Sequence, residues 1–512
     1  MLPLLKSVPQ KMKKQIVSFR GINYSDAYQD GDLSESLNIS TRRFPFLTTR
    51  RARQKMDEYS NVSALSARGS LVVVQGTDLI YDGKVVGQVT AGEKQFAVVN
   101  TKLVIWPDKV YLDLMTETVK PMGAKASGKG VKFTSEYGDI TITGSGWPDL
   151  TTIFNVGDGV KISGSTKAKN NATLKILSMT STVLNFGAGL FEDVTESGTI
   201  TIEREVPDMD YICEANNRLF GCSSELQTIY CSAFGDPINF NINEGIATDS
   251  YAVTVGSDGD FTGCCKHGSS VLFWKEARLH KLLGTYPQEY SMYDYTIEGL
   301  QKGSHKSLQV INEVLYYMGT HGVYAYSGGL PSRLSDNFGE KYFSEGVAGT
   351  DGDNYYLSVK DGEEYSLLVY ETKSGFWFRE DATNAVDFAR VGKDLYMLND
   401  TGEVWLVDAK QEDKDVEWMA QFTPFHESIE GRKLFSKLIL RVELPKSAWM
   451  RIEVRFDNRK WQEVGKIIGR DMDSIPFQLP INRCDRFDVR LSGYGPCTIK
   501  AMQLEYAMGS DV

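Results

Sequence analysis

Short runs of alternating apolar and polar residues fill most of this chain from about residue 60 onward, and the runs end at Gly, Asp or Asn. A period of two residues is typical of half-buried antiparallel strands, whereas an amphipathic helix needs a period of about 3.6 residues. The helical period is hard to find in this sequence. The pattern therefore predicts an all-β protein.

A unit of two strands joined by a polar turn recurs seven times, and its second strand usually carries an aromatic residue. The copies begin at Gly69, Thr101, Asn217, Ser269, Glu313, Asn354 and Lys393. Anchoring apolar positions in the last four copies, from Leu272 to Leu395, follow one another at 43, 40 and 40 residues. A period of about 40 residues built from hairpins is typical of four-stranded propeller blades. We expect a β-propeller of six or seven blades, depending on whether the first and last hairpins share a blade.

Two stretches interrupt this rhythm. The anchors Leu103 and Leu219 are 116 residues apart, and the excess holds short strands between Gly or Asn turns, which predicts a small β domain inserted at residues 122–206. After Asp408 the strands lengthen, and "KLILRVEL" and "WMRIEVRF" alternate strictly over eight residues. Such alternation predicts sheets with one buried face, and hence a terminal β-sandwich.

The predicted domain order follows from these boundaries. It comprises an extended basic N-terminal arm at 1–58, the first blades at 59–121, the insert at 122–206, the remaining blades at 207–412 and the sandwich at 413–512.

Charge is distributed unevenly along the chain. The net charge is −11, yet residues 1–56 hold eleven Lys or Arg against four Asp or Glu, which leaves about −18 on the rest. A basic arm on an acidic body favours docking onto an acidic partner subunit or a neighbouring copy, and contact with nucleic acid is the alternative. No apolar run approaches the ~20 residues of a membrane helix, and the N-terminus lacks the pattern of a signal peptide.

The seven cysteines lie mostly in apolar strand-like runs, and their odd number indicates buried thiols of a chain that folds in a reducing cytosol. There is no Cys-x-x-Cys, and the five histidines are scattered. We therefore expect neither a zinc site nor any other metal or cofactor.

Three segments carry a family resemblance. The first, "FRGINYSDAYQDGDLSESLNISTRRFPFLTTRRAR", contains Phe19, Gly21, Asn23, Asn38, Pro45 and Arg50. The second, "YCSAFGDPINFN", contains Ser232, Gly235, Asp236, Pro237, Asn239 and Phe240. The third, "LYYMGTHGVYAYSGGLPSRLS", contains Gly322, Val323, Tyr324, Pro331 and Ser335. In order and spacing they resemble the β-propeller proteins of phage necks and tails, namely the nozzle, hub or stabilisation proteins of short-tailed phages.

The resemblance implies a virion protein of the tail or neck, assembled in the host cytoplasm as a ring of identical subunits, most often a hexamer. Such a ring continues the DNA channel below the portal, helps to retain the genome and conducts it during ejection. Its partners are the portal or adaptor and other tail proteins, and double-stranded DNA passes without specific binding. An acidic channel wall suits this role because Lys and Arg would hold phosphates.

Two other functions remain open. A tail-tip protein could recognise a host surface glycan through the insert and the sandwich, with Trp147 or Trp377 as exposed aromatic platforms. A propeller enzyme could degrade polysaccharide, but glycoside hydrolysis needs two carboxylates held ~5–9.5 Å apart, and no pair stands out among the 67 acids. No Gly-x-Ser-x-Gly nucleophile motif occurs either, so we expect a non-enzymatic protein.

Overall fold

The computed structural model describes residues 11–409, 416–427 and 431–508, with the backbone alone at 470–472. These residues form strands and five short 3-10 turns but no α-helix, as the alternating pattern predicted. None of them forms a helix long and apolar enough to cross a membrane. The chain divides into two compact units, which are described separately: unit 1 comprises residues 1–60 and 306–512, and unit 2 comprises residues 61–305.

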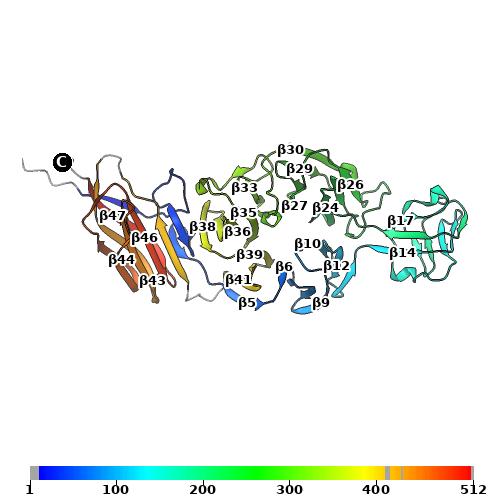
Figure 1. The fold of residues 1–512 in the computed structure, drawn as a ribbon, viewed down its shortest axis with the longest axis horizontal. Coiled ribbons are helices and arrows are strands. Elements are labelled where there is room, and N and C mark those ends of the chain that lie inside the picture. Colours follow the sequence, from blue (N-terminus) through cyan, green and yellow to red (C-terminus); the bar gives the residue numbers. More distant parts are fainter. Residues whose placement is uncertain (1–10, 410–415, 428–430, 509–512) are drawn as a thin grey trace, which may run out of the picture. The chain divides into compact units, whose positions relative to one another are not determined.

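Seven four-stranded antiparallel sheets follow one another along the chain and are the blades of a β-propeller (Figure 1). Unit 2 holds blades 1 to 4. Their strands are β6 (Val62–Arg68), β7 (Ser70–Gln75), β8 (Asp78–Tyr81) and β9 (Lys84–Gln88); β10 (Gln95–Val99), β11 (Lys102–Trp106), β12 (Val110–Asp113) and β13 (Thr118–Pro121); β23 (Tyr211–Ala215), β24 (Arg218–Ser223), β25 (Thr228–Cys231) and β26 (Tyr251–Thr254); and β27 (Gly263–His267), β28 (Ser270–Trp274), β29 (Arg278–Leu283) and β30 (Ser291–Thr296).

Unit 1 holds blades 5 to 7. Their strands are β31 (Gln309–Ile311), β32 (Val314–Gly319), β33 (Gly322–Tyr326) and β34 (Ser332–Arg333); β35 (Ser344–Thr350), β36 (Asn354–Asp361), β37 (Glu364–Glu371) and β38 (Phe376–Asp381); and β39 (Ala385–Val391), β40 (Asp394–Asn399), β41 (Glu403–Val407) and β5 (Gln54–Glu58). Each repeated hairpin of the sequence is the middle pair of a blade. The first and last hairpins belong to different blades, so the count is seven.

Blade 7 is completed by a strand from the other end of the sequence. The strand β5 pairs with β41, with Gln54 opposite Leu406 and Glu58 opposite Glu403. Lys55 supports this pairing, because its Nζ lies 2.7 Å from Glu403. The N-terminal region thus closes the last blade by hydrogen bonds.

The insert between blades 2 and 3 consists of two small sheets around its own core. The first contains β14 (Ala124–Gly128), β22 (Ile200–Arg204), β17 (Gly159–Ser163) and β18 (Thr173–Lys175), and the second contains β19 (Ser178–Met179), β20 (Val183–Asn185), β16 (Asp139–Ile142), β15 (Val131–Thr134) and β21 (Val194–Glu196). The first and last strands of the insert, β14 and β22, pair with each other. The chain therefore enters and leaves the insert at neighbouring strands.

The terminal β-sandwich contains strands from both ends of the sequence. They are β1 (Lys11–Ile16), β2 (Leu33–Leu37), β3 (Ile39–Arg43), β4 (Phe46–Thr49), β42 (Glu417–Phe422), β43 (Lys433–Phe456), β44 (Gln462–Gln478), β45 (Arg483–Cys484), β46 (Phe487–Tyr494) and β47 (Thr498–Met508). The long strand β43 pairs with β47 through its first half and with β46 through its second half. It thereby passes from one layer of the sandwich to the other.

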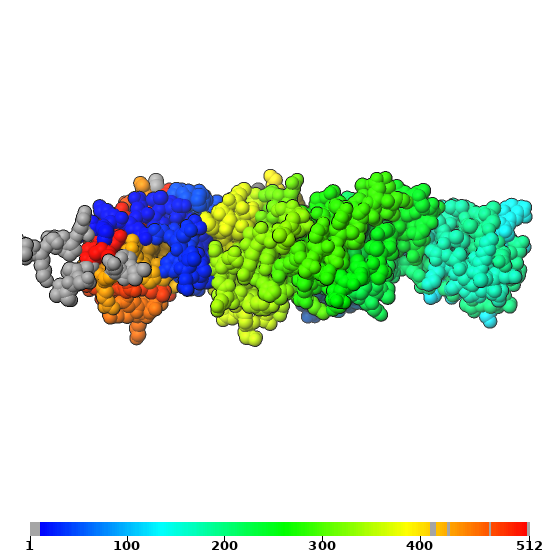
Figure 2. Space-filling view, turned by 90° about the horizontal axis from the view of Figure 1, so that it is seen from above, coloured from blue at the N-terminus to red at the C-terminus, as the bar shows by residue number. Residues whose placement is uncertain are grey.

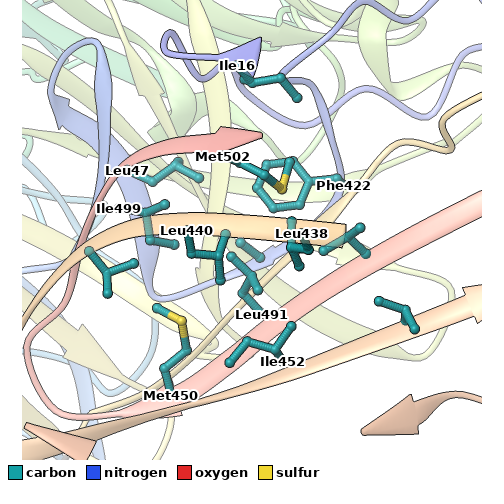
Figure 3. Packing of buried hydrophobic residues seen from close by; sticks show 14 of the residues in the cluster. Ile16, Leu47, Phe422, Leu438, Leu440, Met450, Ile452, Leu491, Ile499 and Met502 are labelled. Atoms are coloured by element: carbon teal, nitrogen blue, oxygen red, sulfur yellow. The ribbon is translucent and has the colours of Figure 1, made fainter. Parts of the chain in front are cut away.

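Apolar side chains of both termini fill the sandwich core. Figure 3 shows Ile16 and Leu47 from the N-terminal strands beside Met502, Ile499 and Phe422, all within one buried cluster. The alternating positions of β43 supply further members, including Leu438 and Ile452. The alternation recognised in the sequence is therefore the buried face of this strand.

The N-terminal region does not form the separate extended arm that we expected for residues 1–58. β1 pairs with β47, β2 with β42 and β4 with β47, so the described part of this region is built into the sandwich and blade 7. The space-filling view shows the blue N-terminal and the orange and red C-terminal residues as one continuous body (Figure 2). The basic charge of this region suggested an exposed arm. Strands such as "KMKKQI" hold too few apolar residues for an alternating pattern to be recognised in the sequence.

Candidate functional site

The first family segment begins at a close approach between two backbones. Ile22 donates its backbone N–H to the carbonyl of Trp377 at 2.8 Å, in strand β38 of blade 6. A Cβ on Gly21 would lie 2.6 Å from that carbonyl oxygen and 2.8 Å from the Cβ of Phe376. Only glycine fits this contact without displacing the strand.

The neighbouring residues of this segment fix its path into the sandwich. Phe19 is fully buried in the sandwich core, with its ring 5.9 Å from that of Phe422, and its backbone N–H donates to the carbonyl of Pro45. Asn23 donates its side-chain amide to Asp32 at 2.9 Å. These motif residues hold the chain in place rather than present groups to solvent.

Asn38 links three segments of unit 1. Its backbone N–H is shared between the carbonyls of Arg379 and Glu380 in β38, and its side-chain amide donates to the carbonyl of Glu417 at 2.9 Å. Its Oδ1 accepts from Nε of Arg50 at 2.8 Å. Asn38 has a φ of 52°, a conformation that Asn tolerates better than most residues. The polar motif residues Asn38 and Arg50 thus act as one connector between the sandwich and blade 6.

Two further arginines of this segment enter a buried ionic cluster that the sequence analysis missed. Arg53 binds Asp381 at 2.7 Å and also Glu380, and Arg42 binds Asp408. Burial alone would raise the pKa of the Asp381 carboxyl, but Arg53 and hydrogen bonds from Thr383 hold that pKa below its ordinary value. We call Gly21, Asn38, Arg42, Arg50 and Arg53 the clasp. The acidic partners lie more than 300 residues from these arginines in the sequence. The Arg-rich end of the motif was therefore the only part of this cluster that the sequence could indicate.

Trp377 lies at the centre of these contacts and is not an exposed aromatic platform. Its side chain is fully buried in the blade core, and its indole N–H donates to the carbonyl of Leu334 at 2.9 Å. The next residue, Phe378, points to the opposite side and is buried in the sandwich core. Strand β38 is therefore a wall shared by blade 6 and the sandwich. Trp147 of the insert is half-buried, and its indole N–H donates to the carbonyl of Lys129.

The second family segment lies in unit 2, between the third and fourth strands of blade 3. Ser232 is fully buried, and its hydroxyl accepts the backbone N–H of Leu219 at 3.0 Å. Gly235 turns the chain with a φ of 72°. Asp236 forms an ion pair with Lys102 at 3.2 Å, and Pro237 is buried.

Asn239 connects this loop to the insert. Its Oδ1 accepts the backbone N–H of Gly159 at 2.9 Å, and its amide donates to Asp158 at 3.1 Å and to Asp236 at 2.6 Å. Asp158 also binds Arg204, so it joins two strands of the insert to the loop. The following residue, Phe240, is buried in the core shared by blades 2 and 3. Asn239 is thus a buried structural link between the loop and the insert.

The third family segment closes blade 5. The hydroxyl of Ser335 accepts the backbone N–H of Val323 at 3.0 Å, and a Cβ on Gly322 would lie 2.2 Å from that hydroxyl oxygen. Tyr324 is buried, whereas Pro331 is half-buried before β34. Within unit 1 this segment packs directly against the first one, because Ile22 shares a buried cluster with Met318, Val323 and Trp377. The second segment belongs to unit 2. All three segments therefore contribute to the architecture.

The cysteines do not form a reactive centre. All seven are free, and four of them pack in the core between blades 3 and 4: Cys213, Cys222, Cys231 and Cys264. Burial raises the pKa of the Cys231 thiol to about 12. Across the described ranges, no group of three or more His, Cys, Asp or Glu side chains is arranged to hold a metal ion.

A cavity of about 550 Å³ in unit 2 is a candidate for ligand binding. Its lining includes Trp106, Tyr211, Phe261, Glu93, Asp210 and His305. His305 lies 3.4 Å from Glu93, and its ring centroid is 5.2 Å from that of Tyr211. Burial raises the pKa of Tyr211 to about 12, so its hydroxyl stays protonated at neutral pH. Trp106 and Phe261 are almost fully buried, whereas Tyr211 is partly exposed and Glu93 and Asp210 are exposed. An aromatic ring beside carboxylates suits a polar ring such as a sugar.

Comparisons with known proteins identify no family for this chain. No family model matches it, and no curated protein matches it. Among solved structures it aligns with BamB from Moraxella catarrhalis at 13% identity and a TM-score of 0.33, over 72% of this chain and 99% of the other. It aligns with Hsv2 from Kluyveromyces lactis at 12% identity and a TM-score of 0.30, over 60% and 69% of the two chains. An exo-β-1,3-galactanase from Phanerochaete chrysosporium aligns at 8% identity and a TM-score of 0.22, over 56% and 92%. An enzyme is thus among the aligned structures, but at these scores the likeness carries no argument about function, and the fold rests on the chain's own sheets.

Proposed function

We propose that this protein is a structural, non-enzymatic component of a phage tail or neck, whose copies form a ring through which the genome passes. The observation that carries the proposal is the division of charge between domains. The sandwich residues 11–53, 416–427 and 431–508 contain 24 Lys or Arg and 15 Asp or Glu, a net charge of +9. The blades and the insert, residues 54–409, contain 29 and 47, a net charge of −18.

Such a division suits a ring made of identical copies. In a head-to-tail ring each subunit contributes two different surfaces, and opposite charges on them favour the correct contact. Acidic blades along a channel would repel phosphates and let DNA slide instead of binding it. The family-like residues support a structural role as well, because they hold strands together.

The remaining parts of the proposal follow from the sequence resemblance. They are a hexameric ring, a place in the virion below the portal or adaptor, and assembly in the host cytoplasm.

Electron microscopy of the purified protein in negative stain, together with native mass spectrometry, tests the proposal. We expect rings with a central channel and a mass of six subunits. A protein that stays monomeric or trimeric at micromolar concentration and low salt would contradict it.

The cavity of unit 2 favours a second candidate function, a tail-tip protein that recognises a host surface glycan. Oligosaccharides from host envelopes should then change the tryptophan fluorescence of the protein, since Trp106 lines the cavity. The substitution Asp210→Ala should weaken that response, because it removes a carboxylate from the lining. If intact host cells and their glycans leave the fluorescence unchanged, the cavity has no such role.

A further inference from the structure

One outer face of the sandwich combines indole rings with cations. Met450, Ile452 and Val454 of β43 are buried in the core. The residues between them point the other way, because successive side chains of a strand alternate. The Trp/Arg face consists of six residues: Trp449, Arg451, Arg455, Trp461, Lys466 and Arg490.

The strand register assembles this face from three strands. Arg451 of β43 lies opposite Lys466 of β44 and Ser492 of β46. Trp449 lies opposite Tyr494 of β46 and Ile468 of β44, and the Ile468 side chain is 66% exposed. Apolar and cationic side chains therefore share one surface across the sheet.

Each indole of the face is in contact with two cations. The ring of Trp461 has the Arg490 guanidinium at 4.3 Å and that of Arg455 at 4.7 Å from its centroid. The ring of Trp449 has the Lys466 ammonium at 4.4 Å and Arg451 at 5.8 Å. These contacts restrict the long cationic side chains before any partner arrives, so less entropy is lost on binding.

The face keeps an excess of positive charge. Three acids lie among its cations, with Arg490 2.9 Å from Glu453, Arg455 3.2 Å from Asp488 and Arg451 3.3 Å from Glu463. The exposed Arg459 and Lys460 lie in the adjoining turn. The face itself has four cations against these three acids, and the adjoining turn adds two cations and one acid, Asp457. With several guanidinium N–H donors per arginine, the face can bind further carboxylates.

We propose that the Trp/Arg face docks onto the acidic blades of the next copy of this chain in the ring. The inference rests on the proposed function, and it names the surface through which the copies meet. Trp and Arg are among the residues that dominate the binding energy of protein interfaces, and the face contains both.

Charge complementarity favours a second copy of this chain as the partner that binds the Trp/Arg face. The blades and insert of every copy carry a net charge of −18, so an acidic partner surface is present at the same concentration as the face itself. A polyanion such as DNA or an acidic polysaccharide could also meet the cations. It would leave the exposed Ile468 side chain uncovered, whereas a protein surface can cover it.

The double substitution Arg451→Glu with Lys466→Glu tests the proposal, because both side chains are exposed and their reversal leaves the core intact. We expect the variant to assemble more weakly, as after the loss of one interface hot spot. The protein concentration needed to keep the rings assembled should rise by about 10-fold or more. The matched control is Lys437→Glu with Arg441→Glu. It makes the same change of charge on the half of β43 that pairs with β47, and it should leave the rings unchanged.

A mixing experiment adds a second readout. A copy with a reversed face can still offer its blades, so a small fraction of the variant should end head-to-tail assembly and give open fragments of the wild-type ring. Native mass spectrometry counts the subunits in those fragments.

The outcomes separate this inference from the proposed function. If the wild type and both variants form rings equally well, the Trp/Arg face is not the interface, although the ring proposal stands. If the wild type forms no rings, the ring proposal fails and this inference fails with it. If the face variant keeps its rings but loses retention on heparin or DNA, the face binds a polyanion and the inference is wrong.

Discussion

At the scale of single residues, the clasp shows how a family-like motif acts through contacts far apart in the sequence. Gly21, Asn38 and Arg53 touch residues of β38 or β42. Each of them satisfies a backbone group, a buried charge or a close approach. Their substitution should therefore change stability before it changes any activity.

Replacing Gly21 with alanine should destabilise the folded protein by about 1–3 kcal/mol, because the new methyl group would press on the backbone of Trp377. Urea unfolding of the purified variant measures this loss. The control is Gly329→Ala, where a Cβ meets nothing within 4 Å. Equal midpoints for the two variants would show that β38 yields to the methyl group.

Asp381 should make stability depend on acid pH. Arg53 and the Thr383 hydrogen bonds hold its pKa in the folded state below the ordinary value of 3.8, which the unfolded chain retains. The stabilisation is therefore complete above the unfolded pKa and is lost as the pH falls through the lower folded pKa. Asp381→Asn should cost about 1–3 kcal/mol at pH 7, because it removes one charged partner of Arg53, which keeps Glu380 as the other.

The measurement is the urea midpoint at several pH values between 7 and 3. The difference between wild type and Asp381→Asn should be constant at neutral pH and should shrink below about pH 4. A difference that grows on acidification would show that the carboxyl is not held in its charged form.

At the scale of elements, pairing within each hairpin is local, but pairing between the chain ends is not. Strict alternation in β43 and the hairpin repeat of about 40 residues predicted the sandwich and the blades. The strands β1 and β5, "KMKKQI" and "QKMDE", are too polar for this pattern, and their partners lie at the other end of the sequence. Their placement is decided by tertiary contacts that no local pattern contains.

The candidate sites differ in the same way. The loop position of Asn239 could be read from its Gly-Asp-Pro turn, which the hairpin repeat placed after a strand. The acids that meet Arg42 and Arg53, and the strands that bring Trp449 and Trp461 next to arginines, depend on register across strands. Register is set by the whole sheet and could not be predicted from one sequence.

Asn239→Ala should loosen the insert. The substitution removes the acceptor for the Gly159 backbone N–H and a donor to Asp158, and one unsatisfied buried group costs about 1–3 kcal/mol. Hydrogen exchange at the Gly159 amide should be faster than in the wild type. Proteolytic cleavage near the insert should also be faster. Asn243→Ala, at an exposed position of the same loop, is the control and should exchange as the wild type does. Unchanged exchange at Gly159 in the Asn239 variant would assign the anchoring to Arg204 alone.

At the scale of the whole molecule, the charge division implies that the proposed assembly should depend on ionic strength. The screening length falls from about 10 Å at 0.1 M salt to about 3 Å at 1 M. An interface between a domain of +9 and a region of −18 should therefore weaken on adding salt.

Sedimentation velocity at increasing sodium chloride concentration measures this effect. We expect the proportion of rings to fall between 0.1 and 1 M salt, and to recover after dialysis to low salt. Rings that persist unchanged at 1 M salt would show that apolar contacts alone hold the copies together.

The sandwich, which contains strands distant in the sequence, also determines when folding can be completed during translation. Lys11 pairs with Ala507 and Leu33 with Phe422, so these strands wait for partners that the ribosome makes hundreds of residues later. Blade 7 likewise stays one strand short until β41 emerges to meet β5. A nascent chain that ends before β43 therefore lacks the complete sandwich and the Trp/Arg face, whatever blades it has folded. If the copies meet through this face as proposed, a chain must be translated through β47 before it can join a ring, so the topology would keep shorter chains out of the assembly.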